Sequence, residues 1–392
     1  MENFEYCCPT RVVFGKGTIA RVSELIDKSK KVLVLYGGGS IKKNGVYEQV
    51  MKALSTHTVL EFSGIEPNPT YETCMGAVDI IKKEGADFLL AVGGGSVLDG
   101  TKFIAAAAKF DINSEGLGGS REPWDILSKE TPLKDALPLG SVITLPATGS
   151  EMNANSVISR TSTQEKLAFA DPHVYPQFSI IDPETTYSLP TSQTINGIVD
   201  TFVHVAEQYA TYDVNTPLQD SWALGLLRTL ISEAPKILEN PNDYDARANI
   251  FWCATCGLNY WMSLGCVQDW STHMIGHELT AFYGLDHGQT LAIVLPRLWE
   301  SQRADKCAKL AKMAREVYGF EGGDDSKACD WAILKTEEFF NSIGQKTKLK
   351  DYDIESQSAA ELVSERIKAR GAAFGERETI TSEVIAEIIK NC

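Results

Sequence analysis

The tetrapeptide Gly-Gly-Gly-Ser occurs twice, at 37–40 and 93–96, and each copy directly follows an apolar run typical of a buried strand. These runs are KVLVLY at 31–36 and DFLLAV at 87–92, and a helical pattern follows each copy. Strands that alternate with helices predict βαβ units and a mostly parallel sheet. The carboxyl ends of such strands border a ligand crevice, where glycine lets backbone N–H groups approach an anion. Either copy alone fits a tight turn equally well, but the pair favours a ligand with two phosphate-bearing regions.

The remaining periodicity predicts two domains. Further strands are predicted at 11–14, 56–64, 139–150 and 176–183, and helices at 18–29, 45–54, 70–85 and 96–110. After Pro190 long helical patterns dominate, at 194–210, 218–240, 304–319 and 381–391. We therefore predict an α/β domain with a mostly parallel sheet over 1–190 and an all-helical domain over 191–392.

Charge and cysteine usage restrict the partners and the compartment. The net charge of −15 argues against nucleic acid or an anionic membrane as a partner, because both need a basic surface. The N-terminus has no signal-peptide pattern, and no uninterrupted apolar stretch reaches about 18 residues. Nine scattered cysteines are typical of free thiols in a reducing cytoplasm, where we expect the protein.

The strand at 31–36 lacks the acidic residue that usually follows it in NAD-binding proteins. Glycines, Ser40, Lys42 and Lys43 come next instead. A carboxylate there would repel a 2′-phosphate, so its absence favours NADP over NAD, although both lysines also fit a plain solvated surface. The segment FGKGTIA at 14–20 matches Gly-x-Gly-x-x-Ala, but without that acidic residue we interpret it as a turn.

The helical half contains a carboxylate and several imidazoles in apolar surroundings. Asp200 and His204 are four residues apart on one predicted helix, as are His273 and His277 on another, and His287 follows a break near Gly284. Each residue alone fits a hydrogen-bonded core position. Buried together they are costly without a partner, and one divalent cation, Fe²⁺ or Zn²⁺, would satisfy them.

A second metal pattern is weaker. Cys253 and Cys256 form Cys-x-x-Cys in an apolar helical segment without a second pair at zinc spacing, so core packing is predicted for them. The segment HMIGHE is not the zinc-protease pattern, because its glutamate follows the second histidine.

Combined, these motifs resemble the iron-containing (group III) alcohol dehydrogenase family over essentially the whole chain. The resemblance rests on PTRVVFGKGTI, YGGGSIKKNGVYEQV, GIEPNPTYET, AVGGGSVLDGTKFIA, ITLPATGSEMNANSVIS and the two histidine segments. It is strongest to the branch of NADPH-dependent butanol dehydrogenases and broad aldehyde reductases. It implies a Rossmann-like domain followed by a helical metal-binding and catalytic domain, as in dehydroquinate synthases.

The resemblance also implies site residues. The metal ligands would be Asp200, His204, His273 and His287. The residues matching cofactor contacts are Gly38, Gly39 and Ser40 for the 2′-phosphate, Gly94, Gly95, Ser96 and Asp99 for the pyrophosphate and nicotinamide end, Thr144, Thr148 and Ser150 for further contacts, Lys166 for a ribose, and Leu189 for the adenine.

The expected reaction is hydride transfer between NADP(H) and a small aldehyde or primary alcohol, such as butanal and butanol. We expect Asp200 to offset the charge of the cation. His277 lies near the metal in the family, and we expect it to relay the proton, alone or through water. The resemblance further implies a homodimer.

Other functions remain open at this stage. One is a polyol or diol dehydrogenase acting on glycerol or a propanediol, and another is a metal-dependent lyase of the dehydroquinate synthase type. The lyase needs several basic residues for a phosphorylated substrate, and 191–300 offers few: Arg228, Lys236, Arg247 and Arg297. Aromatic residues such as Phe202, Trp261, Trp270 and Phe282 fit a small apolar aldehyde better. A metal-dependent hydrolase and a non-catalytic nucleotide-binding subunit are the remaining alternatives.

Overall fold

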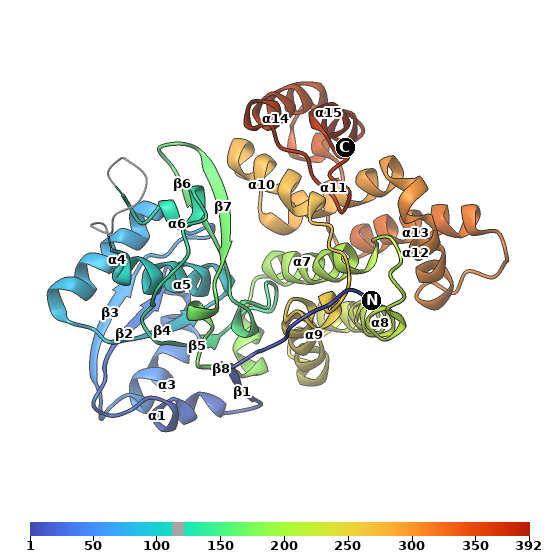
Figure 1. Cartoon of the computed structure of the whole chain (residues 1–392). Coiled ribbons are helices and arrows are strands. Elements are labelled where there is room, and N and C mark those ends of the chain that lie inside the picture. Colours follow the sequence, from blue (N-terminus) through green and yellow to red (C-terminus); the bar gives the residue numbers. More distant parts are fainter. Residues whose placement is uncertain (112–120) are drawn as a thin grey trace. The chain divides into compact units, whose positions relative to one another are not determined.

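The computed structural model describes residues 1–111 and 121–392, and the chain divides into two compact units (Figure 1). One unit comprises Cys7–Leu189, and the other comprises Met1–Tyr6 together with Pro190–Cys392. The first six residues therefore belong to the helical unit, although the domain prediction placed them with the α/β part. They are held there by a bond from Glu2 N to Gly265 O (2.9 Å) and one from Trp261 Nε1 to Tyr6 Oη (2.7 Å).

The described part of the α/β unit contains a six-stranded sheet whose neighbouring strands are all parallel. The strands are β1 (Arg11–Phe14), β2 (Lys31–Tyr36), β3 (Thr58–Ser63), β4 (Phe88–Gly93), β5 (Leu139–Ile143) and β8 (Phe178–Ile181), in the order β1-β8-β5-β4-β2-β3. Every residue of β4 is buried, because this strand lies in the middle of the sheet with helices on both faces. The predicted fold class, a parallel-sheet domain followed by a helical domain, is confirmed.

The direction of strand progression reverses between β2 and β4. From β2 the chain moves outward to β3 and then returns to place β4 on the other side of β2, where Val34 pairs with Leu90. Ligands of open α/β sheets bind at such a switch point, at the carboxyl ends of the strands. Both Gly-Gly-Gly-Ser segments lie there, one after β2 and one after β4.

Helices cover both faces of the sheet. In Figure 1, α1 and α3 lie on one face, and α4 and α5 lie on the other. The helices of this unit are α1 (Val22–Leu25), α2 (Ser40–Lys43), α3 (Val46–Ala53), α4 (Tyr71–Glu84), α5 (Gly95–Lys109) and α6 (Asp125–Ser128), with 3₁₀ turns at Thr18–Arg21, Ser150–Met152, Pro172–Val174 and Pro183–Ser188.

Two elements of this unit were predicted too long, and one hairpin was not predicted. The strand expected over 139–150 ends at Ile143, and a 3₁₀ turn forms at Ser150–Met152. The helix expected over 18–29 is a 3₁₀ turn plus the single turn of α1, because the chain becomes extended at Ile26 and the Asp27 side chain then accepts a hydrogen bond from Ser29 N in a turn. The antiparallel hairpin of β6 (Asn155–Arg160) and β7 (Glu165–Ala170) was not predicted. Its strands carry polar and apolar residues on both faces, so the period-two signal is weak.

The second unit is built from helices around its own hydrophobic core. These are α7 (Thr191–Tyr209), α8 (Pro217–Glu239), α9 (Tyr244–Gly257), α10 (Ser271–Tyr283), α11 (His287–Ser301), α12 (Arg303–Glu316), α13 (Asp325–Ser342), α14 (Ser356–Arg370) and α15 (Ser382–Lys390), with 3₁₀ turns at Trp261–Ser263 and Leu349–Tyr352. Helices α7 and α11 contribute runs of fully buried residues to this core. They therefore hold any polar side chain on their inner faces in fixed positions.

Across residues 1–111 and 121–392, no helix is both long enough and apolar enough to traverse a lipid bilayer.

Candidate metal centre and dinucleotide site

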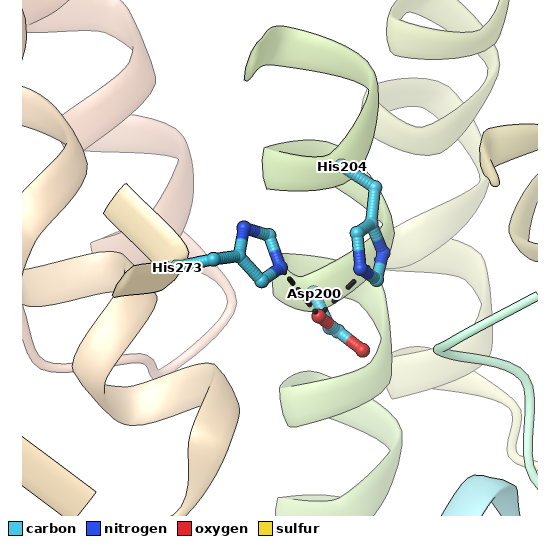
Figure 2. Close-up of side chains that lie close together, drawn as sticks. All are labelled: Asp200, His204 and His273. Carbon is cyan, nitrogen blue, oxygen red and sulfur yellow. Dashed lines mark ion pairs between the residues drawn. The ribbon is translucent and has the colours of Figure 1, made fainter. Parts of the chain in front are cut away.

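Helix α7 carries the first half of the candidate metal centre. Asp200 and His204 are one turn apart, so their side chains project from the same face, and only 4% and 5% of their surfaces are exposed. Nδ1 of His204 lies 3.6 Å from Oδ1 of Asp200. Figure 2 shows the rings of His204 and of His273, which comes from a different helix, both directed toward Asp200.

Helices α10 and α11 supply two more imidazoles. His273 lies in the first turn of α10, and its Nε2 is 3.6 Å from Oδ1 of Asp200. His287 is the first residue of α11, and its Nε2 is 3.5 Å from the same oxygen. Three rings from three helices thus surround one carboxylate oxygen.

These spacings fit a bound divalent cation. Ligand atoms about 2.1 Å from a tetrahedral ion lie roughly 3.4 Å apart, whereas a direct hydrogen bond would bring them closer. One donor atom each from Asp200, His204 and His273 lie within 4.8 Å of one another, and all three residues are buried. The structure therefore brings the four predicted ligands together, with His287 joining through the shared Asp200 oxygen.

The start of α11 is fixed by its cap. The Asp286 side chain accepts from the backbone of Gln289, whose side chain in turn accepts from Asp286 N (2.9 Å), forming a capping box. Asn196 Nδ2 of α7 donates to Asp286 Oδ2 at 2.8 Å. This bond ties α7 to the residue directly before His287, and so it helps to set the distance between His287 and Asp200.

Two further rings border the cluster. The His277 ring centroid lies 5.4 Å from that of His287 and 6.4 Å from that of His273. The Trp270 ring meets His273 edge-on at 5.5 Å. Trp270, one of the aromatic residues expected to contact a small apolar aldehyde, therefore lies next to the candidate metal centre. Phe202 instead is fully buried and packs against Phe340 in the hydrophobic core, away from any substrate surface.

The cluster favours positive charge. Burial lowers the pKa of His273, but the carboxylates of Glu207 and Asp200 outweigh this effect and raise the pKa to about 9. A site that holds a proton so firmly would accept a divalent cation in its place. Glu207 was not predicted as a site residue, although it lies seven residues after Asp200 and thus on the same face of α7.

The loop after β2 leaves room for a ligand. A Cβ on Gly38 or Gly39 would meet nothing within 4 Å, and the backbone of Gly39 has a φ of 93°, which favours glycine. Ser40, which begins α2, is exposed. Predicted contacts of the 2′-phosphate thus lie together on an open surface.

An acidic side chain does lie near this loop, but it comes from β3. Glu61 accepts hydrogen bonds from Tyr36 Oη and Tyr47 Oη, each at 2.9 Å. The ammonium group of Lys42 lies over both tyrosine rings, and its hydrogen bond to Tyr36 raises its pKa. Lys42 therefore keeps a positive charge beside this loop, and the nearby Glu61 carboxylate helps to stabilise it.

The loop after β4 packs tightly on the loop after β5. A Cβ on Gly95 would lie 2.5 Å from Thr148 Oγ1, so only glycine fits there. Thr144 N donates to Gly93 O at 2.9 Å, and Ser150 N donates to Thr148 Oγ1 at 3.2 Å. The structure therefore brings the predicted pyrophosphate loop of Gly94, Gly95 and Ser96 together with Thr144, Thr148 and Ser150.

Asp99 and Ser150 belong to a buried network centred on Lys102, which sequence reasoning missed. Asp99 Oδ1 accepts from Ser150 Oγ (2.7 Å), and Asp99 Oδ2 accepts from Val157 N (3.0 Å). Lys102 is fully buried, and its ammonium group donates to five oxygen atoms of Ser150, Asn153 and Asn155 at 2.7–3.1 Å. A lysine inside the apolar helix at 96–110 was the available signal. The hydrogen bonds of this network hold residues 150–155, which follow the loop after β5, in place.

The last two predicted cofactor residues lie on other elements of this unit. Lys166 of β7 donates to Asn68 Oδ1 at 2.9 Å and is half-buried. Leu189 follows Ser188, whose hydroxyl accepts a hydrogen bond of 3.0 Å from Asn44 Nδ2 beside α2. That bond brings the segment ending at Leu189 to the loop after β2.

The Cys-x-x-Cys segment is part of the core of α9. Cys253 and Cys256 are buried and form no disulfide, and burial raises the pKa of Cys253 to about 12. A thiol that ionises so poorly is a weak nucleophile. These contacts agree with the predicted packing role.

Two family models match the chain. The iron-containing alcohol dehydrogenase model matches residues 9–183, and the C-terminal model of the Fe-containing alcohol dehydrogenase family matches residues 194–392. Together they span both compact units.

Individual relatives match over full length. The chain is 50% identical over 391 residues to the NADPH-dependent aldehyde reductase YqhD of Escherichia coli, covering 99% of each protein. It is 41% identical to the probable NADH-dependent butanol dehydrogenase 1 of Bacillus subtilis, covering 100% of this chain and 99% of that protein. Among solved structures, the substrate- and cofactor-free form of YqhD matches with a TM-score of 0.91 and 48% identity, covering all of both chains. NADH-dependent butanol dehydrogenase A from Thermotoga maritima also matches with a TM-score of 0.91 at 37% identity, covering 100% of this chain and 98% of that one.

Proposed function

The chain belongs to the iron-containing alcohol dehydrogenase family, and on this premise we propose that it is an NADPH-dependent reductase of small aldehydes such as butanal. In the reverse direction it oxidises the corresponding primary alcohols. The observation that carries the proposal is the convergence of three imidazoles on one oxygen of Asp200 at 3.5–3.6 Å. A full-length relative with 50% identity is an NADPH-dependent aldehyde reductase, which supports the same substrate class.

Asp200, His204, His273 and His287 would hold one divalent cation, Fe²⁺ or Zn²⁺. One carboxylate with three imidazoles suits either ion, and the family name favours iron. When bound, the cation would polarise an aldehyde carbonyl group and the nicotinamide would supply a hydride. The Asp200 carboxylate offsets positive charge that three neutral imidazoles leave in place.

His277 is proposed as the proton relay. Its ring borders those of His273 and His287, and an imidazole can both donate and accept a proton near neutral pH. A ring nitrogen of His277 would pass the proton toward the substrate oxygen, directly or through one water molecule.

The two glycine-rich loops are proposed to bind NADPH. Gly94, Gly95 and Ser96 would hold the pyrophosphate with backbone N–H groups at the start of α5, a helix of 15 residues whose N-terminus favours anions. Ser40 and the charged Lys42 would bind the 2′-phosphate. Lys166 and Leu189 would contact the ribose and the adenine.

We further propose that the protein is a cytoplasmic homodimer. None of the nine cysteines, all of which lie in the described residues, forms a disulfide, which supports a reducing compartment. The helical unit exposes Trp222, Trp252 and Trp261 by 40%, 39% and 37%, and the Trp222 and Trp261 rings lie 6.3 Å apart. Neighbouring exposed tryptophans such as Trp222 and Trp261 are typical of an interface, and a second copy of the chain is the proposed occupant. The molar mass in solution can be measured by light scattering after gel filtration. The mass of a monomer would contradict the proposed homodimer.

The central experiment measures NADPH oxidation with butanal by anaerobically purified protein. We expect turnover, one equivalent of iron or zinc by metal analysis, and loss of turnover after chelation. A His273→Ala variant should stay folded but lose both metal and activity. Full activity after chelation would remove the metal from the mechanism, and unchanged NADPH would exclude the reductase. Glycerol and propanediols are assayed in parallel with NADP⁺ and NAD⁺, and their oxidation in preference to butanol would identify a polyol enzyme.

A further inference from the structure

Glu207 is a buried carboxylate beside the candidate metal centre that the set of metal ligands leaves out. It lies on α7 two turns beyond Asp200, with 2% of its surface exposed. A buried carboxylate is costly unless both its oxygens are hydrogen-bonded. Its two partners are therefore informative about its role.

One oxygen of Glu207 binds the backbone of α10. Thr272 N donates to Glu207 Oε1 at 2.6 Å, and Thr272 is the second residue of this helix. The first N–H groups of a helix need external acceptors, and the residue at the N-cap of α10, Trp270, provides none from its side chain. The N–H group of Ser271 donates to Asp269 Oδ1 at 2.8 Å, and Glu207 supplies from α7 the acceptor for the next N–H group, that of Thr272.

The other oxygen binds the ring of His273. Glu207 Oε2 and Nδ1 of His273 form a buried ion pair. Because a carboxylate only accepts, Nδ1 must carry the hydrogen atom. In the neutral ring this leaves the lone pair on Nε2, which is the nitrogen that lies 3.6 Å from Asp200 Oδ1.

We propose that Glu207 is a positioning residue for the metal centre, which caps α10 and holds His273 in the tautomer and orientation that present Nε2 to the cation. This inference rests on the proposed metal site and adds the group that prepares one of its ligands. Carboxylates that bind the second nitrogen of a metal-bound histidine contribute roughly 10- to 100-fold to metal affinity. One side chain of α7 thereby links two ligands of its own helix to a third ligand on α10.

The test measures metal affinity, not turnover. Wild type, Glu207→Gln and Glu207→Asp are titrated with Zn²⁺ against a competing chelator, and the absorption spectrum of each Co²⁺-loaded protein is recorded. Glu207→Gln should bind Zn²⁺ roughly 10- to 100-fold more weakly and show a shifted Co²⁺ spectrum. Glu207→Asp keeps the charge on a shorter side chain and should lie between Glu207→Gln and wild type.

Glu337→Gln is the matched control. Glu337 is a half-buried carboxylate of the same unit that accepts from Thr347 Oγ1 (3.0 Å) and pairs with Arg297. The same substitution there should leave Zn²⁺ affinity and the Co²⁺ spectrum unchanged. Equal loss in both variants would mean that the effect is general destabilisation, and the proposal would be overturned.

A measurement on the wild type keeps the proposal testable if the variants fail to fold. In Zn²⁺-loaded protein with ¹⁵N-labelled histidine, the spectrum should show His273 with its hydrogen on Nδ1, and the opposite tautomer would overturn the proposal. Zn²⁺ binding that is unaffected by Glu207→Gln would overturn this inference while leaving the proposed function intact. A wild type that binds neither Zn²⁺ nor Co²⁺ would overturn both.

Discussion

Gly288 of α11 lies so close to Asn196 of α7 that a Cβ on the glycine would be 2.7 Å from both the Cα and the carbonyl oxygen of Asn196. Neither backbone atom can move without shifting its helix. We expect Gly288→Ala to push α11 away from α7, to destabilise the protein by about 1–3 kcal/mol and to weaken metal binding through His287. Urea unfolding and Zn²⁺ titration measure the two effects. Gly225→Ala in α8 is the control, because its Cβ would meet one atom at 4.0 Å and should be neutral or slightly stabilising.

His277→Ala should slow aldehyde reduction without removing the metal. A proton relay contributes typically about 10²- to 10⁴-fold to the rate, and the ring lies beside the ligands instead of among the atoms that face Asp200. Steady-state kinetics over a range of pH, together with metal analysis, measure this. An unchanged kcat and pH profile would show that another group moves the proton.

The stability of the metal-free protein should depend on the protonation of His273. Its folded pKa of about 9 exceeds the unfolded value of 6.5, so the charged ring stabilises the fold fully below pH 6.5, and this contribution is lost as the pH rises through about 9. After chelation, the difference in free energy of unfolding between wild type and His273→Gln should therefore shrink between about pH 6 and about pH 10. A difference that grew over this range would reverse the assigned sign.

Replacing Lys102 by methionine should damage both stability and cofactor binding. The substitution leaves five oxygen acceptors of Ser150, Asn153 and Asn155 without their buried donor, and breaking such a site costs about 3–5 kcal/mol. Because Ser150 also binds Asp99, we expect weaker NADPH binding, measured by the fluorescence of the cofactor. Lys109→Met at the end of the same helix removes a largely exposed lysine and should change stability by less than about 0.5 kcal/mol.

Ser40→Asp should change the cofactor preference. A carboxylate at the start of α2 would repel the 2′-phosphate, so the Kd for NADPH should rise roughly tenfold or more, while that for NADH changes little. Ser55→Asp, an exposed position after α3, controls for the added charge. Equal weakening of both cofactors by Ser40→Asp would place the 2′-phosphate elsewhere.

The elements that could be predicted from the sequence are those formed by continuous apolar segments. Strands β2 and β4 are apolar runs followed by glycine, and α7 is a long, largely apolar segment that is buried without interruption from Gly197 to Tyr209, so their burial could be predicted directly. The β6–β7 hairpin was missed because its contacts are partly with polar groups, such as the bond from Val157 N to Asp99. Such pairings depend on tertiary structure that periodicity does not encode.

The residues of the candidate site likewise fall into those that could be predicted from the sequence and those that could not. The histidines and Asp200 stand out because ionisable residues are rare in apolar helices. Glu207 and Lys102 are as deeply buried, but single glutamates and lysines are common in helices, and only their partners reveal what they do. The metal ligands could thus be predicted because their residue types are unusual in apolar helices. The roles of Glu207 and Lys102 could be recognised only from their contacts in the structure.

Helix α7 carries Asp200, His204 and Glu207 on one face, and this sets which changes in chain length the protein can tolerate. Each residue of an α-helix turns the chain by about 100°, so one extra residue between Pro190 and Asp200 would rotate all three side chains away together or force a bulge. An insertion in the turn between α7 and α8 would leave their alignment intact. Natural variation in length should therefore collect after Tyr209 and avoid the helix before Asp200.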